Sequence, residues 1–340
     1  MKFKKIAATL AATVLTLAAT ACGSGAGSGA QADSGPQDVT LMLNWYPYGE
    51  HAPFYYGLDQ GIFAKHGINL TVKAGQGSTK TAQAVGSKQV DFGWADTPAV
   101  LANIDKGMPI KSVGVFLQTT PSAVQVFADK NINSVADLKG KTIAVSAGDA
   151  PTTTFPIFLQ RSGLQPNDVK QQNLDAAGKI SAMMSGQVDG LIGFAHDQGP
   201  TIANKSGKEV KYFRYSDAGL SFYSNGLVVN NALAKEKPEL AKKMVAATSE
   251  AFAAAQAKPQ DAVKSMVGKD PQMPPEPVLL DQWQETTKLL ETSATRGKAP
   301  GTNADSDWQA TIQVLSEAKL IESAKPVDTY FDRSAQPAGS

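Results

Sequence analysis

The stretch that decides the fold is Asn44-Trp45-Tyr46-Pro47-Tyr48-Gly49-Glu50-His51-Ala52-Pro53-Phe54-Tyr55-Tyr56, in which aromatic rings, a carboxylate and an imidazole lie close together among helix breakers. It follows an alternating apolar run at 39–43, typical of a strand, and leads into a helical pattern ending in glycine. Because α/β proteins usually bind ligands where strands end, we expect Trp45, Glu50 and His51 to line a ligand site. Phe54 and Tyr55 fit a hydrophobic core equally well.

Residues 1–21 have the pattern of a secretory signal peptide. A basic start is followed by a short, alanine-rich apolar run that is too short for a convincing membrane span. Cys22, the single cysteine, cannot form an internal disulfide. Its position resembles a bacterial lipobox, which predicts acylation of Cys22, although Ala19 stands where a lipobox prefers leucine. Ordinary cleavage after Ala21 is the alternative.

Residues 22–38 are rich in glycine and serine and lack apolar periodicity, which predicts a flexible tether. Together these segments indicate an exported domain that a lipid holds at the outer face of the cytoplasmic membrane. The chain of 340 residues is long enough for two domains. With 32 basic and 31 acidic residues it lacks the concentrated positive charge of a nucleic-acid-binding protein.

From residue 39 onward, short apolar runs alternate with helical patterns. This alternation predicts an α/β protein with parallel pairing in a doubly wound sheet. We expect strands at 39–43, 68–72, 90–94, 111–116, 123–128, 142–145, 169–173, 188–194 and 210–214, and helices at 78–85, 98–106, 134–138, 153–162, 179–185 and 197–206.

One part of this pattern occurs twice. Residues 76–91 and 176–189 each contain a loop, a helix and a strand that begins with Val-Asp, at Val90-Asp91 and Val188-Asp189. Each strand leads into a polar loop. The repeat predicts two halves built on one plan, with a cleft between them. After residue 230 the chain is mostly helical, with amphipathic patterns at 238–256, 261–267, 278–290 and 308–318.

Several motifs in a fixed order resemble the substrate-binding proteins of ABC importers. The resemblance is to the family that groups binders of thiamine-pyrimidine precursors, alkanesulfonates, taurine and nitrate with the fungal thiamine-pyrimidine synthase. It covers about residues 39–332. The residues that carry it are Asn44-Trp45, Glu50 to Tyr55, Gly61 to Ile68, Gly75, Val90 to Gly93, Leu138 to Val145, Val188-Asp189, Ser224 to Val229 and Lys237 to Leu240.

The resemblance implies a bilobal periplasmic-binding-protein fold of type II, the Venus-flytrap architecture, with two hinge crossings and C-terminal helices. The crossings are expected near Ala123–Asp129 and Gly226–Asn231. Lobe 1 then comprises 39–125 and 229–332, and lobe 2 comprises 126–228. A solute that touches both lobes would stabilise the closed form, which engages the transporter.

Carried over position by position, the resemblance implies that loops at strand ends line the solute site. Trp45 and Tyr48 would stack on a flat solute, while Glu50 and His51 would supply polar contacts. Asp96 could instead cap a helix, and Tyr223 could instead pack at the hinge. The full set of expected ligand-binding residues is Trp45, Tyr48, Glu50, His51, Phe54, Gln76, Gly77, Ser78, Trp94, Asp96, Thr97, Thr119, Ser146, Gly148, Thr152, His196, Asp197 and Tyr223.

The predicted function is capture of a flat heterocycle resembling a pyrimidine or thiamine precursor, as a monomer that serves an ABC permease and its ATPase subunits. A sulfonate or an aromatic carboxylate remains an alternative solute. An enzyme like the fungal synthase is disfavoured, since that enzyme needs a cysteine-rich motif. An adhesive or scaffold lipoprotein is a third class. We expect no cofactor and no metal, because His51, His66 and His196 lack metal-ligand spacing.

Overall fold

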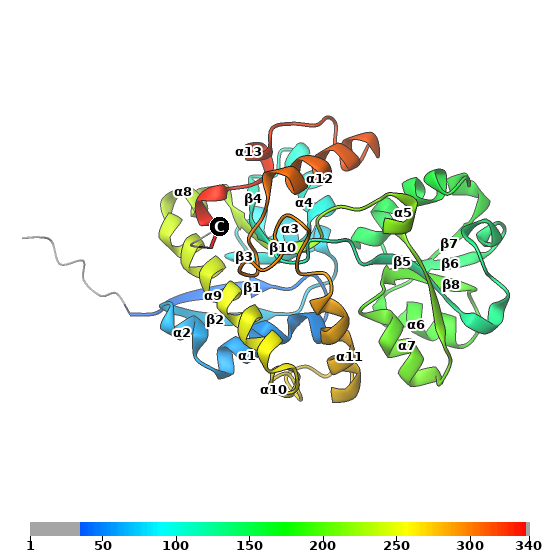
Figure 1. The fold of residues 1–340 in the computed structure, drawn as a ribbon, viewed down its shortest axis with the longest axis horizontal. Coiled ribbons are helices and arrows are strands. Elements are labelled where there is room, and N and C mark those ends of the chain that lie inside the picture. The colour runs from blue at the N-terminus through cyan, green and yellow to red at the C-terminus, as the bar shows by residue number, and fades with distance from the viewer. Residues whose placement is uncertain (1–34, 338–340) are drawn as a thin grey trace, which may run out of the picture. The chain divides into compact units, whose positions relative to one another are not determined.

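The computed structural model describes residues 35–337, and the chain from Pro36 onward forms one compact unit (Figure 1). The predicted signal peptide, Cys22 and most of the predicted tether lie outside the described residues. The end of the tether is corrected, because Gln37 and Asp38 belong to the first strand and pair with Ile68 and Asn69. Backbone pairing at the end of a strand tolerates polar, exposed side chains, so the apolar pattern alone placed the strand start two residues late.

Within residues 35–337, ten strands form two sheets of five. The first sheet has the order β2-β1-β3-β10-β4 and the second sheet the order β7-β6-β8-β5-β9. The bounds are β1 Gln37–Met42, β2 Ile68–Lys73, β3 Phe92–Asp96, β4 Ile110–Val115, β5 Ser122–Phe127, β6 Thr142–Val145, β7 Lys170–Asn173, β8 Gly190–Phe194, β9 Val210–Arg214 and β10 Asn225–Asn230.

Helices cover both sheets (Figure 1). The second sheet carries α5 Ala150–Arg161, α6 Ala176–Met184 and α7 Gln198–Ser206. The C-terminal helices return to the first sheet, as predicted. The helices outside the second sheet are α1 Ala52–Asp59, α2 Ile62–Lys65, α3 Ser78–Gly86, α4 Thr97–Asp105, α8 Asn231–Glu236, α9 Pro238–Ala257, α10 Pro259–Lys264, α11 Glu276–Thr287, α12 Asp305–Glu317 and α13 Val327–Tyr330. In residues 35–337 none of them is long and apolar enough to span a bilayer.

The prediction of parallel pairing is wrong for one strand in each sheet. β10 runs antiparallel to β3 and β4, and β5 runs antiparallel to β8 and β9. Both strands follow a segment in which the chain passes from one sheet to the other. Such a strand enters its sheet from the opposite end, so its direction is reversed. The predicted lobe boundaries at 125 and 229 fall inside β5 and β10, which each pair within a single sheet along their length.

The first sheet packs against an aromatic core that also holds the quoted stretch in place. Phe54, Trp94, Phe116 and Phe252 are fully buried, and their ring centroids lie 4.8–6.1 Å apart. Phe54 meets Trp94 edge to face at 5.0 Å. Aromatic pairs in this geometry add to the gain from burial alone. The core therefore fixes α1, and with it the turn that precedes α1.

Helix α5 begins three residues earlier than predicted. Asp149 caps it by accepting a hydrogen bond from the amide of Thr152 at 2.9 Å. Pro151 stands in the first turn of α5, where proline is well tolerated. The earlier start brings Asp149 to the region between the two sheets.

Candidate functional site

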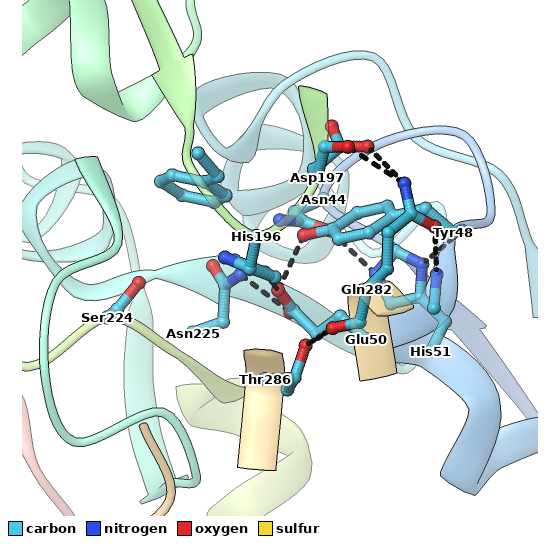
Figure 2. Close-up of polar contacts among 12 residues, drawn as sticks. Asn44, Tyr48, Glu50, His51, His196, Asp197, Ser224, Asn225, Gln282 and Thr286 are labelled. Carbon is cyan, nitrogen blue, oxygen red and sulfur yellow. Dashed lines mark hydrogen bonds and ion pairs between the residues drawn. The ribbon is translucent and has the colours of Figure 1, made fainter. Parts of the chain in front are cut away.

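Glu50 is the centre of a buried hydrogen-bond network, shown in Figure 2. It lies in the 3₁₀ turn η1 (Gly49–His51) and is fully buried. Four side chains donate to its carboxylate: Tyr48 Oη at 2.5 Å, Trp94 Nε1 at 2.5 Å, His196 Nε2 at 2.6 Å and Asn225 Nδ2 at 2.7 Å. Burial would raise the pKa of Glu50, but the hydrogen bond and charge of His196 outweigh it and lower the pKa to about 2.

The bond from His196 joins the two sheets, since His196 follows β8 while Glu50 precedes α1. A carboxylate with four protein donors has little capacity left for a solute. The structure therefore places Glu50 at a junction between the two halves of the molecule, the first being the first sheet with its helices and the second being the second sheet with its helices. The predicted role of Glu50 as a polar contact for the solute gains no support from this geometry.

His51 supports the neighbouring loop. Its Nδ1 accepts the amide of Tyr48 at 3.3 Å, which leaves Nε2 to donate to Asn44 Oδ1 at 2.9 Å. Burial lowers the pKa of His51 to about 4, against the opposing charge of Glu50. The ring is thus neutral at pH 7, and it orients Asn44.

A second junction joins α11 to the start of α7. The side-chain amide of Gln282 donates to the carbonyl of Asp197 at 2.9 Å and to its carboxylate at 3.1 Å, and its oxygen accepts the amide of Gly49. A Cβ at position 49 would lie 2.3 Å from the carbonyl of Leu279, so only glycine permits this approach. Burial raises the pKa of Asp197 to about 8, although Lys179 opposes the shift.

A narrow cavity lies between these junctions. Asn44, Trp45 and Tyr48 line it from the first half, and Phe194 and Gln198 from the second. Trp45 Nε1 and Gln198 Oε1 are buried without a hydrogen-bond partner among the described residues. One is a donor and the other an acceptor, so a solute with both kinds of group would satisfy them.

Lys179 is a buried cation beside this inner cavity. Its side chain is 1% exposed, and its Nζ lies 2.8 Å from Asp149 Oδ2, 2.8 Å from the carbonyl of Ile192 and 5.7 Å from the centre of the Trp45 ring. Asp149 neutralises the charge, and the ammonium over the indole face restrains Trp45.

An outer cavity shares Trp45 with the inner cavity, which is the narrow one between the two junctions. Gln76 and Lys80 line it from the first half, and Ser146 and Asn173 from the second. The shared indole places the two spaces side by side.

Two of the predicted loops touch each other. Gly77 precedes α3 with φ 114°, and Gly148 precedes α5 with φ 83°. The amide of Thr79 donates to the carbonyl of Gly148 at 3.4 Å, and a Cβ on Gly77 would lie 2.8 Å from that oxygen. Glycine is therefore required where these loops meet.

The predicted residues separate into three groups. The inner cavity is lined by Trp45, Tyr48, Gly77, Ser78 and Asp197, and the outer cavity by Trp45, Gln76 and Ser146. The others lie in the core, at the junctions or beside the walls, without lining either cavity: Glu50, His51, Phe54, Trp94, Asp96, Thr97, Thr119, Gly148, Thr152, His196 and Tyr223.

Asp96 and Tyr223 are the two residues for which a structural role was the alternative to ligand binding. The carboxylate of Asp96 accepts Ser224 Oγ at 2.5 Å and makes no cap bond to α4, and burial raises its pKa to about 8. Tyr223 packs edge to face on Trp308 and bonds to the α12 region through its hydroxyl. These contacts hold Tyr223 against α12, and its role at a hinge stays a prediction.

Sequence reasoning missed several residues of this region: Asn44 as a wall residue, Asp149, Lys179, Phe194, Gln198, Asn225 and Gln282. Phe194 and Gln198 flank the predicted His196-Asp197, so a wider window would have included them. Lys179 and Gln282 gave no such signal, since polar residues on a helix usually face solvent.

These features define the fold of periplasmic binding proteins: two sheets of matched order, two crossings and a cavity lined from both halves. A known solved structure, the alkanesulfonate-binding protein SsuA from Xanthomonas axonopodis bound to MOPS, matches with a TM-score of 0.67 at 15% identity, covering 88% of this chain and 99% of that chain.

The sequence profile of the family described as NMT1/THI5 like matches residues 49–262, and this chain belongs to that family. The riboflavin-binding protein RibY of Chloroflexus aurantiacus is 26% identical over 310 residues, 89% of this chain and 87% of its own length. A relative from Legionella pneumophila named 4-amino-5-hydroxymethyl-2-methylpyrimidine phosphate synthase is 25% identical over 300 residues, 87% of this chain and 89% of its own length.

Proposed function

We propose that this protein captures a flat, uncharged heterocycle in the inner cavity and delivers it to an ABC importer. The observation that carries the proposal is the makeup of the cavity wall, where Trp45, Tyr48 and Phe194 come from both halves. A ring held between these side chains would bridge the halves and stabilise their association.

The charges around the inner cavity favour an uncharged ring in that space. Lys179 is paired with Asp149, and the carboxylate of Glu50 is saturated by its donors. With a pKa near 8, Asp197 is mostly protonated at pH 7. An anion entering this space would have to compete with Asp149 for the ammonium of Lys179, at a desolvation cost.

The unpaired polar atoms of the cavity wall indicate which hydrogen-bonding groups the solute carries. Trp45 Nε1 would donate to a ring nitrogen or carbonyl, and Gln198 Oε1 would accept an N–H. A heterocycle with a donor beside an acceptor, such as an aminopyrimidine or a flavin, fits this pair. The printed names of the relatives, a riboflavin binder and an aminopyrimidine phosphate synthase, point to the same ring chemistry.

A sulfonate is the second candidate, because helices α3 and α5 both begin at the Gly77–Gly148 contact and helix N-termini favour anions. The similarity to the alkanesulfonate binder is one of fold only.

The proposal extends to how the protein works in the cell. Residues 1–21 would direct export, Cys22 would carry a lipid, and 22–36 would act as the tether. Lobe 1 would be the first sheet with its helices and lobe 2 the second, hinged at 116–121 and 215–224, the segments that precede β5 and β10. A monomer would then present the closed lobes to a permease with its ATPase subunits.

The test is a calorimetric titration of the mature protein with 4-amino-5-hydroxymethyl-2-methylpyrimidine, riboflavin, taurine and nitrate, followed by mass spectrometry of each mixture. Saturable binding of a heterocycle without chemical change is expected. Binding of taurine or nitrate alone would show that the solute is an anion and not a heterocycle. Conversion of a heterocycle would establish an enzyme, and a lack of binding across the panel would refute solute capture of either class.

A further inference from the structure

The outer cavity has a different chemistry from the inner one. Its lining includes one cation, Lys80, and one carboxylate, Asp175, with the uncharged polar side chains of Gln76, Ser146 and Asn173 between them. The inner wall, in contrast, is largely aromatic and apolar. Trp45 belongs to both walls, so one molecule could pass its edge and occupy both spaces.

Three side-chain oxygen atoms around the outer cavity already accept hydrogen bonds. Asn173 Oδ1 accepts the amide of Ala147 at 2.9 Å, and Gln76 Oε1 accepts Lys80 Nζ at 3.1 Å. Asp175 Oδ1 accepts the amide of Gly178 at 2.7 Å as the cap of α6. The side-chain NH₂ groups of Asn173 and Gln76 are left to donate.

Lys80 adds a further donor. In residues 35–337 its ammonium forms no ion pair, and its one side-chain hydrogen bond goes to Gln76. The outer cavity therefore presents the ammonium of Lys80 and these two side-chain NH₂ groups to a ligand, beside the second carboxylate oxygen of Asp175. Hydroxyl and phosphate oxygens are the acceptors that such a set would satisfy.

We infer that the natural solute has two parts, a flat ring in the inner cavity and an oxygen-rich chain, hydroxylated or phosphorylated, in the outer cavity. This inference rests on the proposed function, since the ring must occupy the inner space. It adds the second binding region and the chemical class of the substituent. Lys80 and Asn173 are its specificity-determining residues, with Lys80 selecting for a terminal negative charge.

The experiment compares two series of compounds that share a ring and differ in the chain. The first is 2,5-dimethylpyrimidin-4-amine, 4-amino-5-hydroxymethyl-2-methylpyrimidine and its phosphate ester. The second is lumiflavin, riboflavin and riboflavin phosphate. Dissociation constants are measured calorimetrically with the full mature chain. In at least one series, the hydroxylated compound should bind about tenfold more tightly than the bare ring, the worth of one or two net hydrogen bonds.

Two variants test whether the tighter binding of the chain-bearing compounds comes from contacts in the outer cavity. Lys80→Met removes the cation, and Asn173→Asp keeps the acceptor for Ala147 while replacing the NH₂ donor. Each should weaken the phosphate ester about fivefold or more, from the loss of one charge-assisted bond, and leave the bare ring within about twofold. Lys170→Met, at an exposed lysine on β7, is the matched control and should change nothing.

A bare ring that binds as tightly as its chain-bearing partners in both series would overturn the inference while the proposed function stands. Equal weakening of ring and ester by Lys80→Met and Asn173→Asp would also overturn it, since the effect would then be structural. If none of the six compounds binds, the flat-heterocycle proposal fails, and the inference fails with it.

Discussion

The two sheets share one topology but carry different chemistry. In each, the strand that arrives by crossing occupies the fourth position and runs antiparallel to its neighbours. The repeated Val-Asp motifs occupy equivalent places. Asp91 Oδ2 accepts the amide of Thr40 at 2.8 Å, and Asp189 Oδ2 accepts the amide of Thr142 at 2.8 Å. The weak repeat in the sequence therefore reflects a real structural repeat.

The loops at the ends of β3 and β8 differ. Asp96 bonds to Ser224, next to β10 of the same sheet, while His196 reaches across to Glu50. The repeat thus builds two similar frames, each a sheet with its helices. Residues outside the repeat, in η1 and α11, join the two frames. The scaffold of two sheets is therefore symmetric, whereas the contacts that join the sheets are not.

Breaking the Glu50 junction should have the largest effect on stability. Glu50→Leu leaves four buried donors without their acceptor, so we expect a loss of about 3–5 kcal/mol in the free energy of unfolding. Urea denaturation followed by circular dichroism measures it. Glu291→Leu, at an exposed glutamate outside the network, serves as the control. A loss for Glu50→Leu no larger than that of the control would show that the network does not stabilise the fold.

The pH dependence tests the buried carboxyls on the two strand-end loops. Asp96 and Asp197 have pKa values raised by burial to about 8, so between pH 4 and 8 the folded protein holds protons that the unfolded chain releases. Stability must then fall as pH rises through this interval, by about 1.4 kcal/mol per pH unit for each carboxyl.

The window from pH 6.5 to 7.5 isolates this effect. His51, whose pKa falls from 6.5 to about 4, makes stability rise with pH mainly below that window and offsets only a small part of the decline within it, and Glu50 contributes only at still lower pH. Urea midpoints at the two pH values should therefore show a decline, and Asp96→Asn should remove about half of it. A midpoint that rises or stays level in the wild type contradicts the raised pKa values.

The repeated aspartates allow a matched comparison. Asp91→Ala and Asp189→Ala each remove a charged acceptor from a half-buried strand amide, so each should cost about 1–2 kcal/mol of stability, with similar values in both sheets. Asp281→Ala, at an exposed position on α11, should cost almost nothing. Clearly unequal losses at 91 and 189 would show that the two frames are not energetically equivalent.

Much of the scaffold followed from local pattern. The alternation of apolar runs and helical periods predicted strands such as β2 and helices such as α3 to within a few residues, because both depend on nearby side chains. Strand direction depended on a crossing between distant segments, and local pattern does not encode it. This is why β5 and β10 were missed as antiparallel strands.

The site was predictable where it lies beside a motif. Five of the predicted ligand-binding residues, Trp45, Tyr48, Gly77, Ser78 and Asp197, line the inner cavity. The carboxylate of Glu50 accepts hydrogen bonds from Trp94, His196 and Asn225, which lie far apart in the sequence. Local pattern does not show that these three side chains meet at one carboxylate. Gln282 lies on a helix whose polar face would ordinarily point to water, and its packing against Gly49 and the start of α7 buries it.

The most direct test of the account is the affinity of Trp45→Ala for the heterocycle that binds most tightly to the wild type, measured by calorimetry beside Tyr55→Ala. Tyr55 is a half-buried aromatic on α1 that lines neither cavity. We predict that Trp45→Ala weakens binding at least about tenfold, the usual worth of a buried aromatic anchor, while Tyr55→Ala leaves it unchanged. An unchanged dissociation constant for Trp45→Ala would contradict the claim that the solute lies in the inner cavity between the two halves.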